Sequence, residues 1–236
     1  MAGYLLLEGG AEFGGQMAAA DQQAIALAGG PQARVSILPT AAAPDHNNQR
    51  AGANGVRWFR GLGARQVEVV PVIDAASAGS PALAEALRQS RLIYLLGGFP
   101  GYLARILAGS ACLQAMLDAY AAGAVIAGSS AGAMVLCQHY FDPKQEQASP
   151  GLGLLPNTCV LPHHNTFGKN WAARLEQALP EAVLLGIDER TGMLDDGEGG
   201  RKAGWRVYGQ GAVTIYRRGK PTAYPAGTGF TDSFAP

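Results

Sequence analysis

Five apolar runs in the first two-thirds of the chain constrain its fold more than any other feature. Several of them lack the polar and apolar alternation of a half-exposed strand, which is typical of a parallel sheet buried on both faces. The runs are Tyr4–Leu7, Val35–Leu38, Val67–Val72, Leu92–Leu96 and Ala124–Ala127. Helical patterns separate them, at Gln16–Ala28, Asn47–Leu62, Pro81–Gln89 and Cys112–Ala121. This rhythm predicts an α/β fold with a doubly wound, mostly parallel sheet and flanking helices.

The last third of the chain has a different character. Between Gly186 and Tyr224, short β-prone pieces such as Trp205–Val207 and Ala212–Tyr216 are separated by glycine-rich turns. They predict a small antiparallel extension on one edge of the sheet. A chain of 236 residues suits one domain, residues 1–236.

Charge and composition exclude several classes of function. Lys+Arg and Asp+Glu both number 18, so there is no basic field to bind nucleic acid. No stretch approaches the roughly 18 apolar residues that a membrane span needs. Three cysteines without a CxxC pair fit a reducing compartment. We therefore expect a cytoplasmic protein that binds neither nucleic acid nor membrane, with a homodimer left open.

The segment AVIAGSSAGAMVL, residues 124–136, indicates a strand, a tight turn and the start of a helix. Its centre, Gly128 to Gly132, fits a nucleophile elbow, in which a serine on a strained turn projects its hydroxyl clear of the sheet. Small neighbours two residues either side prevent backbone collisions. Ser130 is then the candidate nucleophile and the Ala131 N–H a candidate oxyanion donor. The alternative is an ordinary Gly/Ala-rich turn.

A nucleophilic serine needs a base, and the chain has four histidines. His46 lies in a predicted loop, and His139 lies nine residues beyond Ser130, where a rigid helix would carry it away. His163 and His164 follow the apolar run 159–161 and are the best candidates. Because adjacent residues of an extended segment point to opposite sides, only one of the two can face Ser130.

Two further positions complete the candidate site. Asp188 and Glu189 end the apolar run 184–187, and only one of these acids can point at a given site; a solvated strand end is the alternative. Gly97–Gly98 closes another predicted strand, and a backbone N–H exposed there could complete an oxyanion hole. The sequence GGFPG, residues 97–101, is equally consistent with a simple tight turn.

With these pieces in order, nearly the whole chain resembles the serine peptidase family that includes cyanophycinase and dipeptidase E. The order serine, histidine, acid makes the match specific, because the histidine commonly comes last in α/β hydrolases. The matching segments are LPTAAA (38–43), FRGLGARQVEVV (59–70), LLGG (95–98), AGSSAGA (127–133), GLGLLPN (151–157) and GIDERTG (186–192).

The resemblance implies a fold like that of class I glutamine amidotransferases and a role for each matching position. It implies that Ser130 is the nucleophile, His163 the base and Glu189 the orienting acid. It also implies that Gly98 and Ala131 supply the oxyanion donors. The activity implied is hydrolysis of amide bonds in small peptides; the alternatives are an esterase with the same triad and a non-catalytic amidotransferase-like module.

The chain departs from the family pattern near the expected substrate. Leu161–Pro162–His163–His164 stands where members often carry Asp-Gln-His-Phe, and Phe99–Pro100 replaces Asp-Gln or Asn-Thr. We therefore expect Phe99 and His164 to be substrate-binding or, for His164, structural. An apolar Phe99 predicts a preference that is not restricted to aspartate. No cofactor and no metal are expected, since the adjacent histidines splay apart and the acidic turn 195–198 is too short for an EF-hand.

Overall fold

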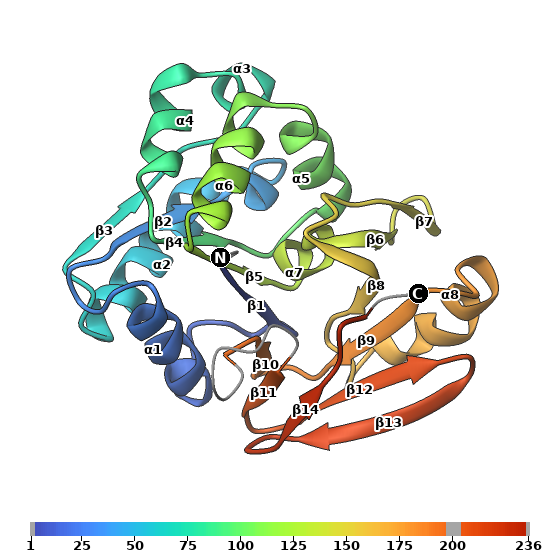
Figure 1. Cartoon of the computed structure of the whole chain (residues 1–236). Coiled ribbons are helices and arrows are strands. Elements are labelled where there is room, and N and C mark those ends of the chain that lie inside the picture. The colour runs from blue at the N-terminus through green and yellow to red at the C-terminus, as the bar shows by residue number, and fades with distance from the viewer. Residues whose placement is uncertain (1–2, 197–203, 235–236) are drawn as a thin grey trace.

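The computed structural model describes residues 3–196 and 204–234, which form two β-sheets with helices around the first of them (Figure 1). The larger sheet has eight strands in the order β14-β11-β10-β1-β5-β4-β2-β3. Its parallel part, confirmed as expected, comprises β1 (Tyr4–Glu8), β5 (Val125–Ser129), β4 (Leu92–Leu95), β2 (Arg34–Leu38) and β3 (Gln66–Val69). Antiparallel strands extend it beyond β1: β10 (Thr191–Leu194), β11 (Gly204–Gly209) and β14 (Gly229–Thr231).

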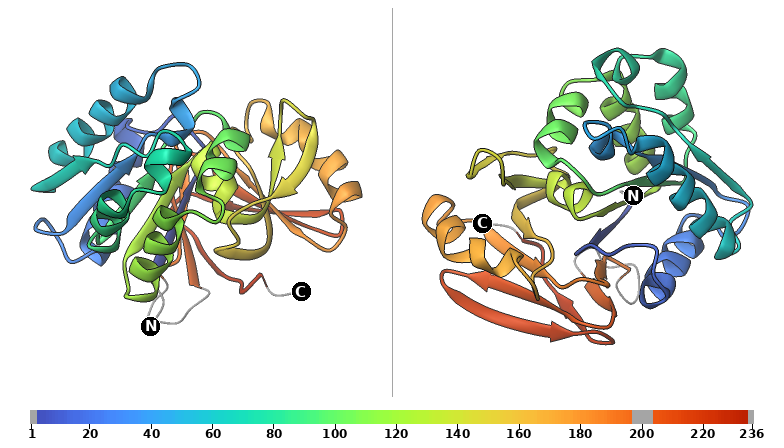
Figure 2. Two further views of the ribbon diagram at one scale, coloured as in Figure 1. Left: turned by 90° about the horizontal axis from the view of Figure 1, so that it is seen from above. Right: turned by 180° about the vertical axis from the view of Figure 1, so that it is seen from behind.

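Helices cover both faces of the parallel part, as Figure 2 shows from two further sides. One face packs against α1 (Ala18–Leu27) and α2 (Asn48–Gly61), and the core there is built from residues such as Phe59 and Tyr94. The other face carries α3 (Ala75–Ala78), α4 (Pro81–Arg88), α5 (Pro100–Leu107), α6 (Ala111–Ala121) and α7 (Ala131–Leu136). Short 3₁₀ turns lie in two of these connections, at Gly15–Met17 and Thr40–Ala42, and a further one, Gly168–Trp171, precedes α8 (Ala172–Ala178).

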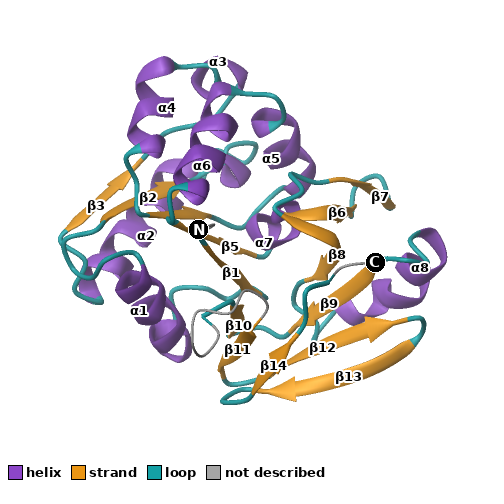
Figure 3. Cartoon of the chain, viewed as in Figure 1, coloured by secondary structure: helices purple, strands orange, loops and turns teal. Residues whose placement is uncertain are grey.

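The second sheet has six strands in the order β13-β12-β9-β8-β6-β7 (Figure 3). Parallel strands β6 (Cys137–Asp142), β8 (Leu155–Leu161) and β9 (Val183–Ile187) form its centre. The antiparallel strands β7 (Gln147–Pro150), β12 (Ala212–Arg217) and β13 (Lys220–Pro225) close its two edges, and α8 (Ala172–Ala178) connects β8 to β9. One hydrophobic core joins both sheets, with Leu95 and Leu185 in the same cluster.

The C-terminal third is more extensive than the single edge extension expected from sequence. Its strands divide between two sheets, because β11 pairs with β10 of the first and β12 with β9 of the second. Residues Asp195 and Asp196 of the expected acidic turn follow β10, and Gly197–Glu198 lie outside the described residues. No helix in the described part of the chain is both long and apolar enough to cross a membrane.

One local prediction was wrong. The helix after Ser130 ends at Leu136, so His139 lies on strand β6 rather than within that helix. Residues 142–150 belong to a hairpin, in which Asp142 ends β6 and Gln147 begins β7. The turn GGFPG leads directly into helix α5, in which Pro100 is the first residue, a position where a missing N–H costs nothing.

Candidate active site

The turn between β5 and α7 has the backbone of a nucleophile elbow. Ser130 adopts φ 48° and ψ −111°, a conformation that non-glycine residues avoid and that clusters at functional sites. A Cβ on Gly128 would lie 2.5 Å from the carbonyl carbon of Gly132, and a Cβ on Gly132 would overlap the carbonyl oxygen of Leu95. Glycine at both positions lets the turn close. The Ser130 N–H donates to the Glu8 carbonyl at 3.0 Å.

The hydroxyl of Ser130 begins a chain of three hydrogen-bonded side chains. Ser130 Oγ lies 3.1 Å from His163 Nε2, and His163 Nδ1 lies 2.8 Å from Glu189 Oε1. His163 follows β8 and Glu189 follows β9, so the parallel centre of the second sheet delivers both. The side chains are 20% and 31% exposed, which leaves the imidazole within reach of a substrate. This arrangement has the geometry of a serine hydrolase triad.

The loop after β1 contacts both the backbone and the ring of His163, which the sequence analysis did not predict. Gly9 O accepts the His163 N–H at 2.7 Å, and Gly10 O accepts the Arg190 N–H at 2.9 Å. Gly10 has φ +112°, and a Cβ there would overlap the His163 ring. The signal available in the sequence was the pair Gly9–Gly10, which comes soon after the predicted strand Tyr4–Leu7. On the outer side, the ring of Phe167 stacks on the imidazole with centroids 4.9 Å apart.

His164 points away from Ser130 and belongs to a second, structural set of contacts. Its Nε2 lies 2.8 Å from the Tyr216 hydroxyl and its Nδ1 lies 3.4 Å from Asp188 Oδ1. Asp188 Oδ2 in turn accepts the Ala212 N–H at 2.9 Å, which ties β9 to β12. Burial lowers the pKa of His164 despite the neighbouring Asp188 carboxylate. These contacts favour the structural alternative for His164 over a substrate-binding role.

Two backbone N–H groups lie beside the elbow in positions suited to an oxyanion. Ala131 is the first residue of α7, where an N–H has no intrahelical acceptor. The Gly98 N–H has no hydrogen-bond acceptor among the described residues. Gly98 has φ +139°, and a Cβ there would overlap the Ala41 carbonyl oxygen, so glycine is required for this approach.

A cavity of about 880 Å³ opens beside Gly98. Phe99 lines it, and the Lys144 ammonium lies 4.3 Å from the Phe99 ring centroid. Arg105 stacks over Tyr102 on the same wall, at 5.2 Å. The β6–β7 hairpin forms the opposite rim. Further lining residues include Pro44, Tyr140, Asp142, Gln145, Ser149 and Leu152.

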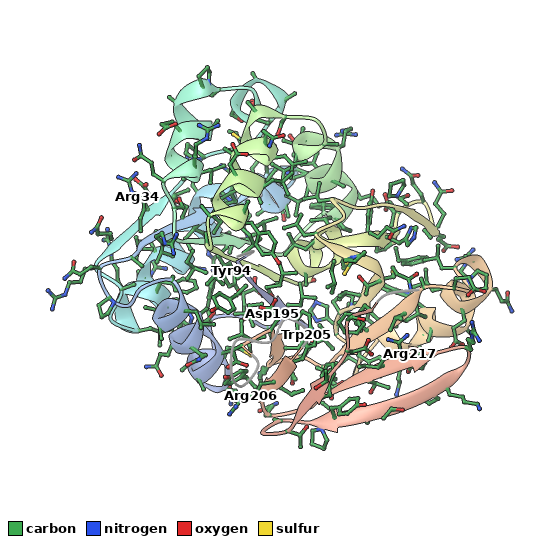
Figure 4. All side chains as sticks on the ribbon, in the orientation of Figure 1. Arg34, Tyr94, Asp195, Trp205, Arg206 and Arg217 are labelled. Carbon is green, nitrogen blue, oxygen red and sulfur yellow. The ribbon has the colours of Figure 1, made fainter. Side chains whose placement is uncertain are left out.

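An unusual group of buried acids lies behind the elbow, on the face that α1 and α2 cover. Glu8 and Asp21 are 1% and 0% exposed. Glu8 Oε2 accepts a hydrogen bond from Tyr94, which lies in the interior (Figure 4), and Asp21 Oδ2 accepts one from Trp58 Nε1 at 2.7 Å. Burial raises the pKa of Glu8 well above its usual range and that of Asp21 to about 7.

In each of these carboxyl groups, one buried oxygen has no hydrogen-bond partner among the described residues: Glu8 Oε1 and Asp21 Oδ1. A proton held between the two groups satisfies both oxygens and removes one buried charge. The sequence reasoning did not find this pair, because the acids lie 13 positions apart on different elements. Within the described residues, no group of three or more His, Cys, Asp or Glu is placed to hold a metal ion.

Comparison with known proteins identifies the family. The model of peptidase family S51 matches residues 5–202. Cyanophycinase from Trichormus variabilis is 28% identical over 203 residues, covering 80% of this chain and 64% of that protein. Cyanophycinase from Thermosynechococcus vestitus is 30% identical over 205 residues, covering 80% and 60%. The chain thus spans less than two thirds of the length of these relatives.

A solved structure matches the chain over almost its full length. It is a peptidase from an acI-B1 actinobacterium, with a TM-score of 0.87, 29% identity and coverage of 98% of both chains. The similarity therefore includes the second sheet, which carries His163 and Glu189. Together with the family match over most of the sequence, it shows that the chain belongs to peptidase family S51, a family of serine-type peptidases.

Proposed function

We propose that the chain is a serine hydrolase that cleaves amide bonds in small peptides, with Ser130 as nucleophile, His163 as base and Glu189 as the acid that orients it. The observation that carries this proposal is the continuous hydrogen-bonded chain from the strained Ser130 through His163 to Glu189. The match to peptidases of family S51 supports the amide as the bond that is cleaved.

The mechanism follows from these positions. Ser130 Oγ attacks the peptide carbonyl carbon while its proton passes to His163 Nε2, and Glu189 stabilises the imidazolium through Nδ1. The carbonyl oxygen gains the negative charge and accepts hydrogen bonds from the Gly98 and Ala131 N–H groups. His163 then donates its proton to the leaving nitrogen, and the C–N bond breaks. A water molecule, deprotonated by His163, hydrolyses the acyl ester and regenerates Ser130.

The substrate class follows from the cavity beside Gly98. Walls from α5 and the β6–β7 hairpin favour short or terminal peptides over folded proteins. Phe99 gives the wall next to the oxyanion donors an apolar surface, so we propose an exopeptidase or dipeptidase-like activity that is not restricted to aspartyl residues. The relatives found by sequence are cyanophycinases, and the Phe99–Pro100 departure argues for a different side-chain preference here.

Two measurements test the proposal together. A fluorophosphonate probe should label the protein at Ser130, as located by mass spectrometry, and should fail to label Ser130→Ala. A dipeptide library with N- and C-blocked controls should reveal the peptides that are cleaved. Absence of both a Ser130 adduct and any peptide cleavage would favour the non-catalytic module. Cleavage confined to aspartyl dipeptides would contradict the role given to Phe99.

A further inference from the structure

Glu12 is the one acidic side chain of the β1–α1 loop, and the backbone holds it in a defined place. The residues on either side of it, Ala11 and Phe13, have φ of 55° and 64°. The Phe13 ring packs against Tyr94 at 5.6 Å and Trp58 at 6.2 Å between centroids, which anchors the loop in the core. Positive φ at two non-glycine residues carries a conformational cost that packing must offset.

The Glu12 carboxylate lies beside the nucleophile. Glu12 Oε2 accepts a hydrogen bond from the buried Ser129 hydroxyl at 2.9 Å. Glu12 Oε1 and Ser130 Cβ each lie 3.4 Å from the place that a Cβ on Gly97 would take. The carboxylate therefore sits between the strand end that carries Gly98 and the elbow that carries Ser130. It is partly exposed, so a bound molecule can contact it.

No positive side chain in the described parts of the chain, residues 3–196 and 204–234, forms an ion pair with this carboxylate. Behind it lie Glu8 and Asp21, two further acids, whose pKa values its charge helps to raise. An uncompensated negative charge beside the nucleophile opposes the oxyanion that forms there, because like charges repel strongly in a partly buried site. A positive group on the substrate would remove that conflict.

We infer that Glu12 binds the α-ammonium group of the substrate and so restricts the enzyme to peptides with a free N-terminus. The inference deepens the proposed function and rests on it. The α-nitrogen is two bonds from the carbonyl carbon that Ser130 attacks, so it necessarily lies close to the serine side chain. Glu12 is then a specificity-determining residue: its carboxylate accepts a hydrogen bond from the ammonium while Ser129 fixes its other oxygen.

The test compares the best dipeptide from the library with its N-acetyl twin. In the unaltered enzyme, kcat/KM should be at least about tenfold higher for the free amine, the scale of a hydrogen bond to a charged group. Glu12→Gln keeps the shape and an acceptor for Ser129 but removes the charge, and should abolish most of this preference. Ser129→Ala is the companion variant: it removes the hydrogen bond that fixes Glu12 but keeps the carboxylate, so the preference should fall less than in Glu12→Gln.

A binding measurement separates this inference from the proposed function. In Ser130→Ala, calorimetry should show the free dipeptide bound at least about tenfold more tightly than its N-acetyl twin, and adding Glu12→Gln should remove the difference. Equal binding of the two peptides would overturn the inference even where Ser130 labelling upholds the hydrolase. An equal loss of kcat/KM on both peptides in Glu12→Gln would show that Glu12 only positions the elbow. A third peptide, an Nα-acetylated dipeptide with lysine as its first residue, tests whether a side-chain ammonium is the true ligand of Glu12. If it binds as tightly as the dipeptide with the free α-amine, the inference is overturned.

Discussion

The buried pair of Glu8 and Asp21 makes the stability of the protein depend on pH in an unusual direction. Burial raises the pKa of Glu8 well above its ordinary range, and that of Asp21 from 3.8 to about 7. The folded state therefore holds protons that the unfolded state releases. The stabilisation is fully present below the unfolded pKa values, near pH 4, and is lost as pH rises through the folded values. Alkaline conditions should weaken the fold.

The magnitude follows from the number of protons retained. Each proton that the folded state keeps and the unfolded state releases lowers the free energy of unfolding by about 1.4 kcal/mol per pH unit. Between pH 5.5 and pH 7, one shared proton gives a loss of about 2 kcal/mol. The two carboxyl groups lie beneath the elbow, since the Glu8 carbonyl accepts the Ser130 N–H.

The assay is denaturant unfolding at several pH values between 5 and 8, on the native sequence and on the double variant Glu8→Gln/Asp21→Asn. The amides keep the volume and can accept from Tyr94 and Trp58, but they do not titrate. The contributions of the other ionisable groups to the free energy of unfolding cancel in the difference between the two proteins. The double variant should gain stability relative to the native sequence as pH rises. Parallel stability curves across this range would refute the shared proton.

Four further substitutions test the elbow and the proposed triad. Ser130→Ala should lower kcat/KM at least about a thousandfold with an unchanged Tm, since one small hydroxyl contributes little packing; retained peptidase activity would contradict the nucleophile assignment. Glu189→Gln should reduce turnover far more than Asp188→Asn, and the reverse order would make Asp188 the orienting acid. Gly132→Ala should cost about 1–3 kcal/mol in chemical denaturation, because its Cβ overlaps the Leu95 carbonyl oxygen; an unaltered unfolding midpoint would show that the turn can relax.

The elements predictable from sequence were those that a single pattern determines. The runs around Leu92 and Val125 are apolar at every position because both faces of the strand are covered by helices. Helix α5 was missed because Pro100 resembles a turn residue, although proline at the first helical position is well tolerated. His139 was misplaced because the length of α7 depends on where the chain turns into β6, which is a matter of tertiary packing.

Contacts between distant segments were harder to predict. The spacing of His163 and His164 indicated that one ring faces Ser130, and the family resemblance selected which one. The pairing of Glu8 with Asp21, and the place of Glu12 beside Gly97, depend on the path of the chain from β1 to α1. Periodicity carries no information about such a loop, because its conformation rests on positive φ at Ala11 and Phe13.

The β1–α1 loop also explains how residues from two sheets can act as one site. Ser130 comes from the first sheet, whereas His163 comes from the second. The adjacent carbonyl groups of Glu8 and Gly9 accept the backbone N–H groups of Ser130 and His163, at 3.0 and 2.7 Å. Neighbouring peptide units have a fixed separation, so these two bonds hold the backbones of Ser130 and His163 close to each other. A side chain at Gly9 would overlap the Asp188 carbonyl oxygen and push the second sheet away. The alignment of the proposed triad therefore depends on the end of β1 as much as on Ser130, His163 and Glu189 themselves.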